Sequence, residues 1–198
     1  PVLDEKKPGS THKGYHWVYY APEKQIVLFD YRPGRGRDGP KECLRDFSGY
    51  LQSDGYSAYD IFGKREGITL LNCMAHARRQ FEKALNSDPD RAQYAMNKFQ
   101  QLYDIERHAR EENMSNEQRR SLREEKALPI LEELEAWMRE TSTQVTPKSA
   151  LGKAIAYSLK RWEALKIYTS QGRLEIDNNL VENQIRPSAL GRKNYLFA

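Results

Sequence analysis

The segment Glu175-Ile-Asp-Asn-Asn-Leu-Val-Glu-Asn-Gln-Ile-Arg-Pro187 decides how the rest of this 198-residue chain is interpreted. Its apolar residues recur at helical spacing, which predicts a short amphipathic helix with Asp177 as its N-cap. The helix carries one carboxylate, Glu182, among amide and cationic side chains. The alternative role for Glu182 is an ordinary surface ion pair with Arg186, one helical turn further on.

A second acid, Asp54, ends the strand-like run Gly49-Tyr-Leu-Gln-Ser-Asp54 and is followed by a glycine. In open α/β sheets, ligand-binding groups collect at the carboxyl ends of strands. An aspartate there can reach a metal ion while its backbone stays in the sheet; the alternative is a turn aspartate that binds its own backbone. An acid on a strand and an acid on a late helix, both set among basic residues, indicate a divalent-metal site that acts on phosphodiesters.

The composition is that of a globular chain with a mildly basic balance. The net charge of +4 and the pI near 9.0 fit a phosphate-rich partner without requiring one. Cys43 and Cys73 cannot form a disulfide framework, so we expect a reducing, cytoplasmic environment. We expect no membrane partner, because no apolar run approaches the ~18–20 residues of a membrane span. The chain opens on Pro1 rather than Met, and we interpret it as a piece of a longer protein.

The order of predicted elements favours an α/β fold. Residues 16–20 and 25–30 predict a β-hairpin, and residues 49–54 and 68–73 predict two further strands. Helices are expected at residues 41–47, 75–85, 90–112, 116–140 and 149–169. Pro129 is expected to kink or divide the fourth of them. We therefore predict three parts: a sheet core begun by residues 1–87, a helical insertion at 88–147, and closing helices at 148–198.

Other polar side chains have weaker patterns. Cys73 and His76 form a Cys-x-x-His pair, but a structural zinc ion needs about four ligands, so a buried cysteine and a cleft-lining His76 are favoured. Arg35 and Arg37 lie in a Gly-rich loop that either approaches a phosphate backbone or is an ordinary solvated exit from the hairpin. Arg119 is expected on a solvated helix face, because acidic residues lie nearby.

Three motifs resemble the catalytic domain of insertion-sequence-66 transposases. They are Gly49-Tyr-Leu-Gln-Ser-Asp-Gly-Tyr56, Cys73-Met-Ala-His-Ala-Arg-Arg-Gln-Phe81, and Ile176 to Pro187 with its continuation to Phe197. Gly14-Tyr-His-Trp-Val-Tyr19 is also similar to that family, so the resemblance covers nearly the whole chain in order. It implies a ribonuclease-H-like fold, in which a mixed sheet core carries an all-helical insertion before the last catalytic helix.

The resemblance also implies an acidic DDE triad, in which Asp54 matches the second acid and Glu182 the third. Both would be catalytic residues and metal ligands, with two Mg²⁺ or Mn²⁺ ions as cofactors. The first acid belongs to an Asp-Glu-Thr-Pro-like motif that we expect just upstream of Pro1, and Asp4 is not assigned to it. We therefore expect this stretch to be inactive without the upstream aspartate.

The function implied by the resemblance is DNA strand cleavage and strand transfer on double-stranded DNA, at element ends and target. The residues expected to contact DNA are Arg35, Arg37, Asn179, Asn183, Arg186, Arg192 and Lys193. A homo-oligomer on DNA, accessory proteins and a nucleoid-associated place in the bacterial cytoplasm are also implied. Two alternatives stay open: a ribonuclease-H-like nuclease that hydrolyses without joining, and a DNA-binding or assembly module without catalysis.

Overall fold

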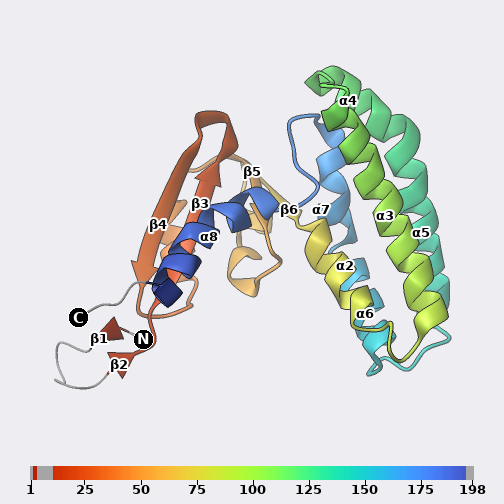
Figure 1. Cartoon of the computed structure of the whole chain (residues 1–198), viewed down its shortest axis with the longest axis horizontal. Coiled ribbons are helices and arrows are strands. Elements are labelled where there is room, and N and C mark those ends of the chain that lie inside the picture. Colours follow the sequence, from red (N-terminus) through yellow and green to blue (C-terminus); the bar gives the residue numbers. More distant parts are fainter. Residues whose placement is uncertain (1, 4–10, 195–198) are drawn as a thin grey trace. The chain divides into compact units, whose positions relative to one another are not determined.

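The computed structural model describes residues 2–3 and 11–194, with side chains described from residue 13 to residue 186. It is an α/β structure whose chain forms two compact units (Figure 1). The first unit holds Pro1–Gly49, Tyr56–Thr69 and Asn178–Ala198, and the second holds Tyr50–Gly55 and Leu70–Asp177. The α/β class is confirmed. The domain limits at residues 88 and 147 and the ribonuclease-H-like core stay predictions.

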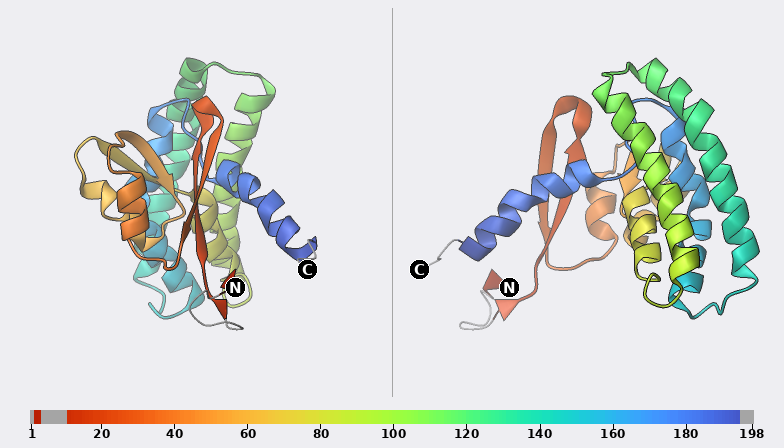
Figure 2. Two further views of the ribbon diagram at one scale, coloured as in Figure 1. Left: turned by 90° about the vertical axis from the view of Figure 1, so that its left-hand side faces the viewer. Right: turned by 45° about the vertical axis from the view of Figure 1, so that its right-hand side comes forward.

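The first unit is built on the predicted hairpin. β3 (Tyr15–Ala21) pairs antiparallel with β4 (Ile26–Arg32), and Figure 2 shows the pair as a long twisted ribbon. Trp17 of β3 is buried, and its ring lies 5.9 Å from that of Tyr56 and 5.8 Å from that of Tyr59. Aromatic packing therefore fixes the hairpin within its own unit.

The other elements of the first unit are mostly short. They are β1 (Val2–Leu3) paired with β2 (Thr11–His12), α1 (Asp38–Cys43), the 3-10 helices Pro22–Lys24, Ser57–Tyr59 and Phe62–Lys64, and α8 (Asn179–Asn194), which contacts β3. The helix predicted at 41–47 is shifted, since α1 starts before Pro40. A proline in the first helical turn loses no hydrogen bond, so it did not mark the boundary.

Two further strands end at the candidate site. β5 (Gly49–Ser53) and β6 (Ile68–Asn72) are neighbours in one two-stranded sheet. The Gly49 amide donates to the Gly67 carbonyl (2.7 Å) at the start of both strands, and the Cys73 amide donates to the Ser53 carbonyl (3.1 Å) at their ends. The strands therefore run in the same direction. Within the described residues there are three separate two-stranded sheets.

The second unit is a helical bundle. Its helices are α2 (Met74–Glu82), α3 (Pro89–Glu111), α4 (Asn116–Leu122), α5 (Leu128–Ser142), α6 (Ala150–Lys160) and α7 (Trp162–Lys166). α3 and α5 lie side by side, and α2 packs against α3 and α6 (Figure 2). Its core is apolar and includes the buried side chains of Phe99, Leu134 and Trp162. None of the described helices has the length and apolar character that a bilayer crossing requires.

A π-helical turn, Arg123–Ala127, joins α4 to α5 without interrupting the helix. Pro129 has no N–H and its ring would clash with the carbonyl four residues back, so a wider turn before it relieves the conflict. The α-helix is divided near Pro129 into α4 and α5, as predicted, although the chain stays helical through the π turn. Arg123, the first residue of the turn, is 0% exposed.

The single helix predicted at residues 149–169 is wrong. The chain leaves the α-helix after Lys160, resumes it in α7, and continues as the 3-10 turn Ile167–Ser170. Arg161 at the break has φ −113° and ψ 7°, and its guanidinium donates to the Gly55 carbonyl (3.2 Å). The apolar spacing did not reveal the break because Trp162 and Leu165 stay buried beyond it.

Candidate functional site

Asp54 follows directly after β5, and its side chain is exposed. The backbone around it is fixed: the Tyr157 hydroxyl donates to the Asp54 carbonyl (3.3 Å), and Arg161 donates to the next carbonyl, that of Gly55 (3.2 Å). On the strand side, the Gly55 amide donates to the hydroxyl of buried Ser53 (3.3 Å). An accessible carboxylate on a fixed backbone is what a metal ligand at a strand end requires.

Tyr157 and Arg161 form the outer part of this frame. The Arg161 guanidinium lies 4.2 Å from the centre of the Tyr157 ring, a cation–π contact that holds both side chains in place. Burial raises the pKa of the Tyr157 hydroxyl despite the opposing charge of Arg161. The hydroxyl therefore stays protonated at neutral pH and remains a hydrogen-bond donor to the strand end.

The backbone conformation at position 55, beside Tyr157 and Arg161, requires a glycine. Gly55→Ala is therefore expected to lower the free energy of unfolding by about 2–4 kcal/mol. Its φ is +83°, and a Cβ would lie 2.7 Å from the Tyr157 hydroxyl and 3.0 Å from Arg161 Nε. Gly67→Ala is the matched control, because φ is +80° there but the nearest atom, Ser48 Cβ, is 3.6 Å away. Urea unfolding of both variants measures the difference. Equal losses of unfolding free energy would mean that Tyr157 and Arg161 move away from the new methyl group at no cost.

Glu182 lies in the first turn of α8. The Asn178 carbonyl accepts hydrogen bonds from the amides of Val181 (3.0 Å) and Glu182 (3.2 Å), so Asn178 occupies the N-cap position. The prediction of Asp177 as the cap is therefore wrong by one residue. Asp177 is buried, and its carboxylate accepts a hydrogen bond from the Tyr103 hydroxyl (2.9 Å).

Several predicted site residues share one face of α8, because they recur at i, i+3, i+4 and i+7. They are Asn179, Glu182, Asn183 and Arg186. Glu182 is half-buried, and the other three are exposed. Between these described side chains there is no ion pair from Glu182 to Arg186, so the surface-pair alternative is not formed. The predicted DNA contacts Arg192 and Lys193 belong to the last turn of α8, and their side chains lie outside the described residues.

The Gly-rich loop of the first unit is anchored at Arg35. Its guanidinium lies 4.7 Å from the centre of the Tyr56 ring and 5.6 Å from that of Tyr15, and the Tyr56 hydroxyl donates to the Arg35 carbonyl (3.0 Å). Arg37 directly precedes α1. Both arginines are exposed, so an ordered loop presents two cations at the surface.

His76 lies on α2, the helix that follows β6. It is half-buried: Nε2 is 3.5 Å from Arg79 Nη1, and the buried Nδ1 has no hydrogen-bond partner within residues 13–186. Cys73 is buried. Over the described ranges no group of three or more His, Cys, Asp or Glu side chains is placed to hold a metal ion. Asp54 belongs to the second compact unit and Glu182 to the first, so their pairing around a metal ion stays a prediction.

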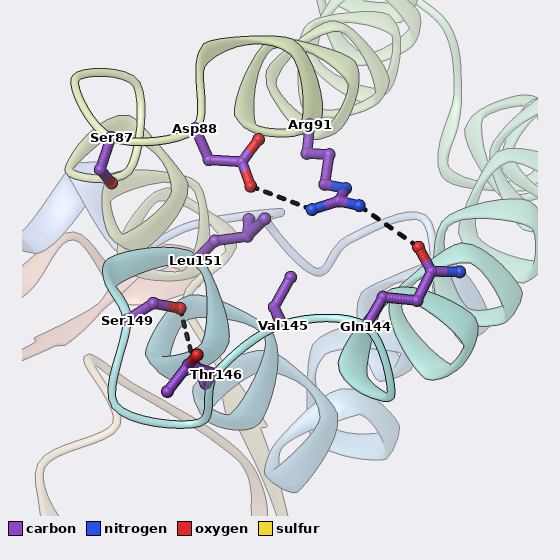
Figure 3. A pocket seen from close by; sticks show the side chains of 8 residues that line it. All are labelled: Ser87, Asp88, Arg91, Gln144, Val145, Thr146, Ser149 and Leu151. Carbon is purple, nitrogen blue, oxygen red and sulfur yellow. Dashed lines mark hydrogen bonds and ion pairs between the residues drawn. The ribbon is translucent and has the colours of Figure 1, made fainter.

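Two cavities lie in the helical unit and contain none of the predicted site residues. The first, of about 260 Å³, is lined by side chains between Ser87 and Arg91 and between Gln144 and Leu151 (Figure 3). In it, Arg91 bridges Asp88 (3.3 Å) and Gln144 (3.4 Å). The second, of about 480 Å³, is lined by Asn116, Glu117, Arg120 and residues 171–173. Neither of these two cavities therefore supports the candidate site.

A buried ion network in the helical unit was missed by the sequence analysis. Arg123 donates to both carboxylate oxygens of fully buried Glu106 (2.7 and 2.8 Å), and Arg119 donates to the same carboxylate (2.6 Å) and to Glu175 (3.0 Å). Arg119 is thus mostly buried and not on a solvated face. Burial alone would raise the pKa of Glu106, but the two guanidiniums hold it below its ordinary value. The available signal was that Glu106 shares the helical spacing of Phe99 and Leu102.

Comparison with known proteins places the chain among transposases. Residues 1–198 match the family described as Transposase IS66 family. Three relatives in Sinorhizobium fredii (strain NBRC 101917 / NGR234) are the uncharacterized proteins y4qI, y4jD and y4hP, which are 36%, 32% and 31% identical over 206, 185 and 209 residues. The alignments cover 96%, 89% and 93% of this chain and 38%, 36% and 38% of those relatives, so the chain spans less than half of their length. No solved structure matches. The chain belongs to the Transposase IS66 family, as the resemblance predicted.

Proposed function

We propose that this chain is the catalytic core of a DNA transposase that carries out metal-dependent DNA strand cleavage and strand transfer, on a ribonuclease-H-like arrangement of its strands. The observation that carries the proposal is the frame around Asp54, which holds the strand end rigid and leaves one carboxylate exposed. Membership of a transposase family supports the same reaction class.

Asp54 and Glu182 fit a Mg²⁺ or Mn²⁺ site by their chemistry, because hard divalent ions prefer carboxylate oxygens and need few protein ligands. Together with an upstream acid they would hold two ions. Such ions, when bound, activate an attacking water or DNA 3′-hydroxyl and stabilise the leaving oxygen. The chain's own part is to fix the carboxylates: Asp54 through its strand end, and Glu182 through the first turn of α8.

The polar face of α8 is proposed to hold the DNA backbone beside the two acids. Asn179 and Asn183 offer amide donors and Arg186 offers a cation, all exposed on the face that carries Glu182. Such groups bind phosphate oxygens and fix register without reading sequence. Arg35 and Arg37 would supply a second phosphate contact. Joining two element ends to a target also requires more than one active site, so the proposed working form is a homo-oligomer on double-stranded DNA.

Arg186→Gln is expected to weaken DNA binding uniformly across sequences and to reduce the slope of log K against log salt concentration by about 0.9, because one phosphate contact is lost. The measurement is a salt titration of DNA affinity with the full-length protein. Arg110→Gln is the control, since Arg110 is exposed on α3, in the helical unit. An unchanged slope for Arg186→Gln would remove this residue from the DNA interface.

The direct test is to incubate the full-length protein with Mg²⁺ and DNA that carries the element ends. Joined products are expected. Nicks without joining would favour the nuclease alternative, and binding without any cleavage would favour the assembly module. Asp54→Asn should abolish all products, whereas Asp60→Asn, which neutralises another exposed aspartate six residues away, should not. Equal activity of the two variants would contradict the role of Asp54.

A further inference from the structure

The segment Gln171–Asp177, called here the 171–177 link, leads from the helical bundle to α8. It is packed closely at its start: a Cβ on Gly172 would lie 1.8 Å from the carbonyl oxygen of Asn116. No side chain fits at this point without moving backbone. The link therefore begins in a fixed contact with the start of α4.

The buried arginines of the π turn and α4 bind the link directly. Arg123 donates to the carbonyls of Gln171 (2.7 Å) and Leu174 (2.8 Å) while Glu106 holds its guanidinium from the other side. The Arg119 guanidinium donates two hydrogen bonds to the carboxylate of Glu175, of 3.0 and 3.1 Å. Because these groups are largely withdrawn from water, the bonds are geometrically demanding as well as strong.

The last residue of the link is tied to α3. The hydroxyl of Tyr103 donates to the buried carboxylate of Asp177 at 2.9 Å. Burial, together with the neighbouring Asp177 charge, raises the pKa of Tyr103, so the hydroxyl remains a donor across the accessible pH range. Asp177 directly precedes Asn178, whose carbonyl starts α8.

The other side of the link is bound to the strand that ends in Asp54. The side-chain amide of Gln52, two residues before Asp54, donates to the Glu175 carbonyl (2.8 Å). The amide of Met74 at the start of α2 donates to the Ile176 carbonyl (3.0 Å). The link is therefore held between the helical bundle and the end of β5.

We propose that Tyr103, Arg119 and Arg123 are positioning residues, which fix the 171–177 link against β5 and so determine where the helix that carries Glu182 begins. The helical bundle would then act on the reaction from a distance, by fixing Asp177, the residue that directly precedes the N-cap of α8. This inference rests on the proposed function for its catalytic consequence, but its structural part concerns the link alone.

The test uses a matched pair of tyrosines on α3, each of which donates to a carboxylate at 2.9 Å: Tyr103 to Asp177 and Tyr94 to Glu133. Each tyrosine is replaced by phenylalanine in the full-length protein, which removes one hydroxyl and keeps the ring. The first measurement is hydrogen exchange at the amides of Leu174, Val181 and Glu182, which are hydrogen-bonded within the link or the first turn of α8.

Tyr103→Phe is expected to speed this exchange about tenfold and to slow DNA cleavage by a similar factor, because one bond to a charged group is lost. DNA affinity should stay nearly unchanged, and the melting temperature should fall by only about 3–6 °C. Tyr94→Phe should change neither the exchange nor the cleavage. Glu175→Gln, which weakens the grip of Arg119 and leaves the backbone intact, should reproduce the effect of Tyr103→Phe.

Unchanged exchange in Tyr103→Phe, or an equal change in Tyr94→Phe, would overturn the inference. Faster exchange with undiminished cleavage would also overturn it, since the link would then not matter for the reaction. The two proposals can fail separately. If the wild-type protein cuts no DNA, the proposed function is wrong. If Tyr103→Phe, and not Tyr94→Phe, still speeds amide exchange in the link, the structural part of the inference holds.

Discussion

Glu182→Gln in the full-length protein is expected to slow DNA strand cleavage by at least about 10³-fold, while DNA affinity stays within about threefold. The substitution keeps the size of the side chain and removes the charge that a divalent cation requires from its ligand. The polar face of α8, including Asn179 and Arg186, is left intact. Single-turnover cleavage and a separate binding titration measure the two effects.

The control for this variant is Glu66→Gln, which removes the same charge from an exposed loop position just before β6. It should leave cleavage at the wild-type rate. If Glu182→Gln cleaves as fast as Glu66→Gln, Glu182 has no part in the reaction. A parallel loss of cleavage and DNA binding would instead assign Glu182 to the organisation of α8 rather than to a metal ion.

Glu106→Gln is expected to lower the free energy of unfolding by about 3–5 kcal/mol at pH 7, because it leaves two buried guanidiniums facing a neutral amide. Glu106 and Arg123 are both 0% exposed, so solvent water cannot compensate the Arg123 guanidinium for the carboxylate that it loses. Urea unfolding at pH 7 is the measurement. The matched control is Glu133→Gln, which breaks the ion pair of Lys98 with Glu133 (2.7 Å), an exposed glutamate in the same bundle, and should have little effect.

The same variant should alter the pH dependence of stability. The folded-state pKa of Glu106 lies below its ordinary value of 4.5, so its contribution is present above about pH 4.5 and is lost as the pH falls through the folded-state value. The difference between wild type and Glu106→Gln should therefore be constant at neutral pH and shrink on acidification. A difference that stays constant down to the acid transition would show that charge is not its source.

Much of the local structure could be predicted from the sequence, because it depends on neighbouring residues. Runs rich in β-branched and aromatic residues located β3 and β4, and helical spacing located α3 and α5. The chemistry of Pro129 located the irregular turn before α5. The family itself was identified from motifs, which carry more information than periodicity does.

The remainder depends on contacts between residues that are distant in the sequence. Arg161, at the break, donates to the carbonyl of Gly55, 106 residues away, a contact that no helical pattern encodes. Arg119 was predicted to face solvent because acidic residues lie near it in the sequence. Its actual partners, Glu106 and Glu175, lie in other parts of the chain, so sequence neighbours could not reveal them. For the candidate site, the residue types at Asp54 and Glu182 were visible in the sequence. The frame that fixes the Asp54 backbone was not.

The π turn makes the positions of side chains in the α4–α5 helix depend on the number of residues in the turn. A π turn holds about one residue more than an α-helical turn, so removing a single residue from Arg123–Ala127 would let the helix close into regular α geometry and would change the positions of the side chains within the turn. Arg123 lies in this turn, and its guanidinium donates to the carbonyls of Tyr168, Gln171 and Leu174, so these bonds depend on the geometry of the turn. Homologues that differ by one residue in this turn should therefore be aligned by structure, since simple gap placement would equate an interior arginine with a surface position.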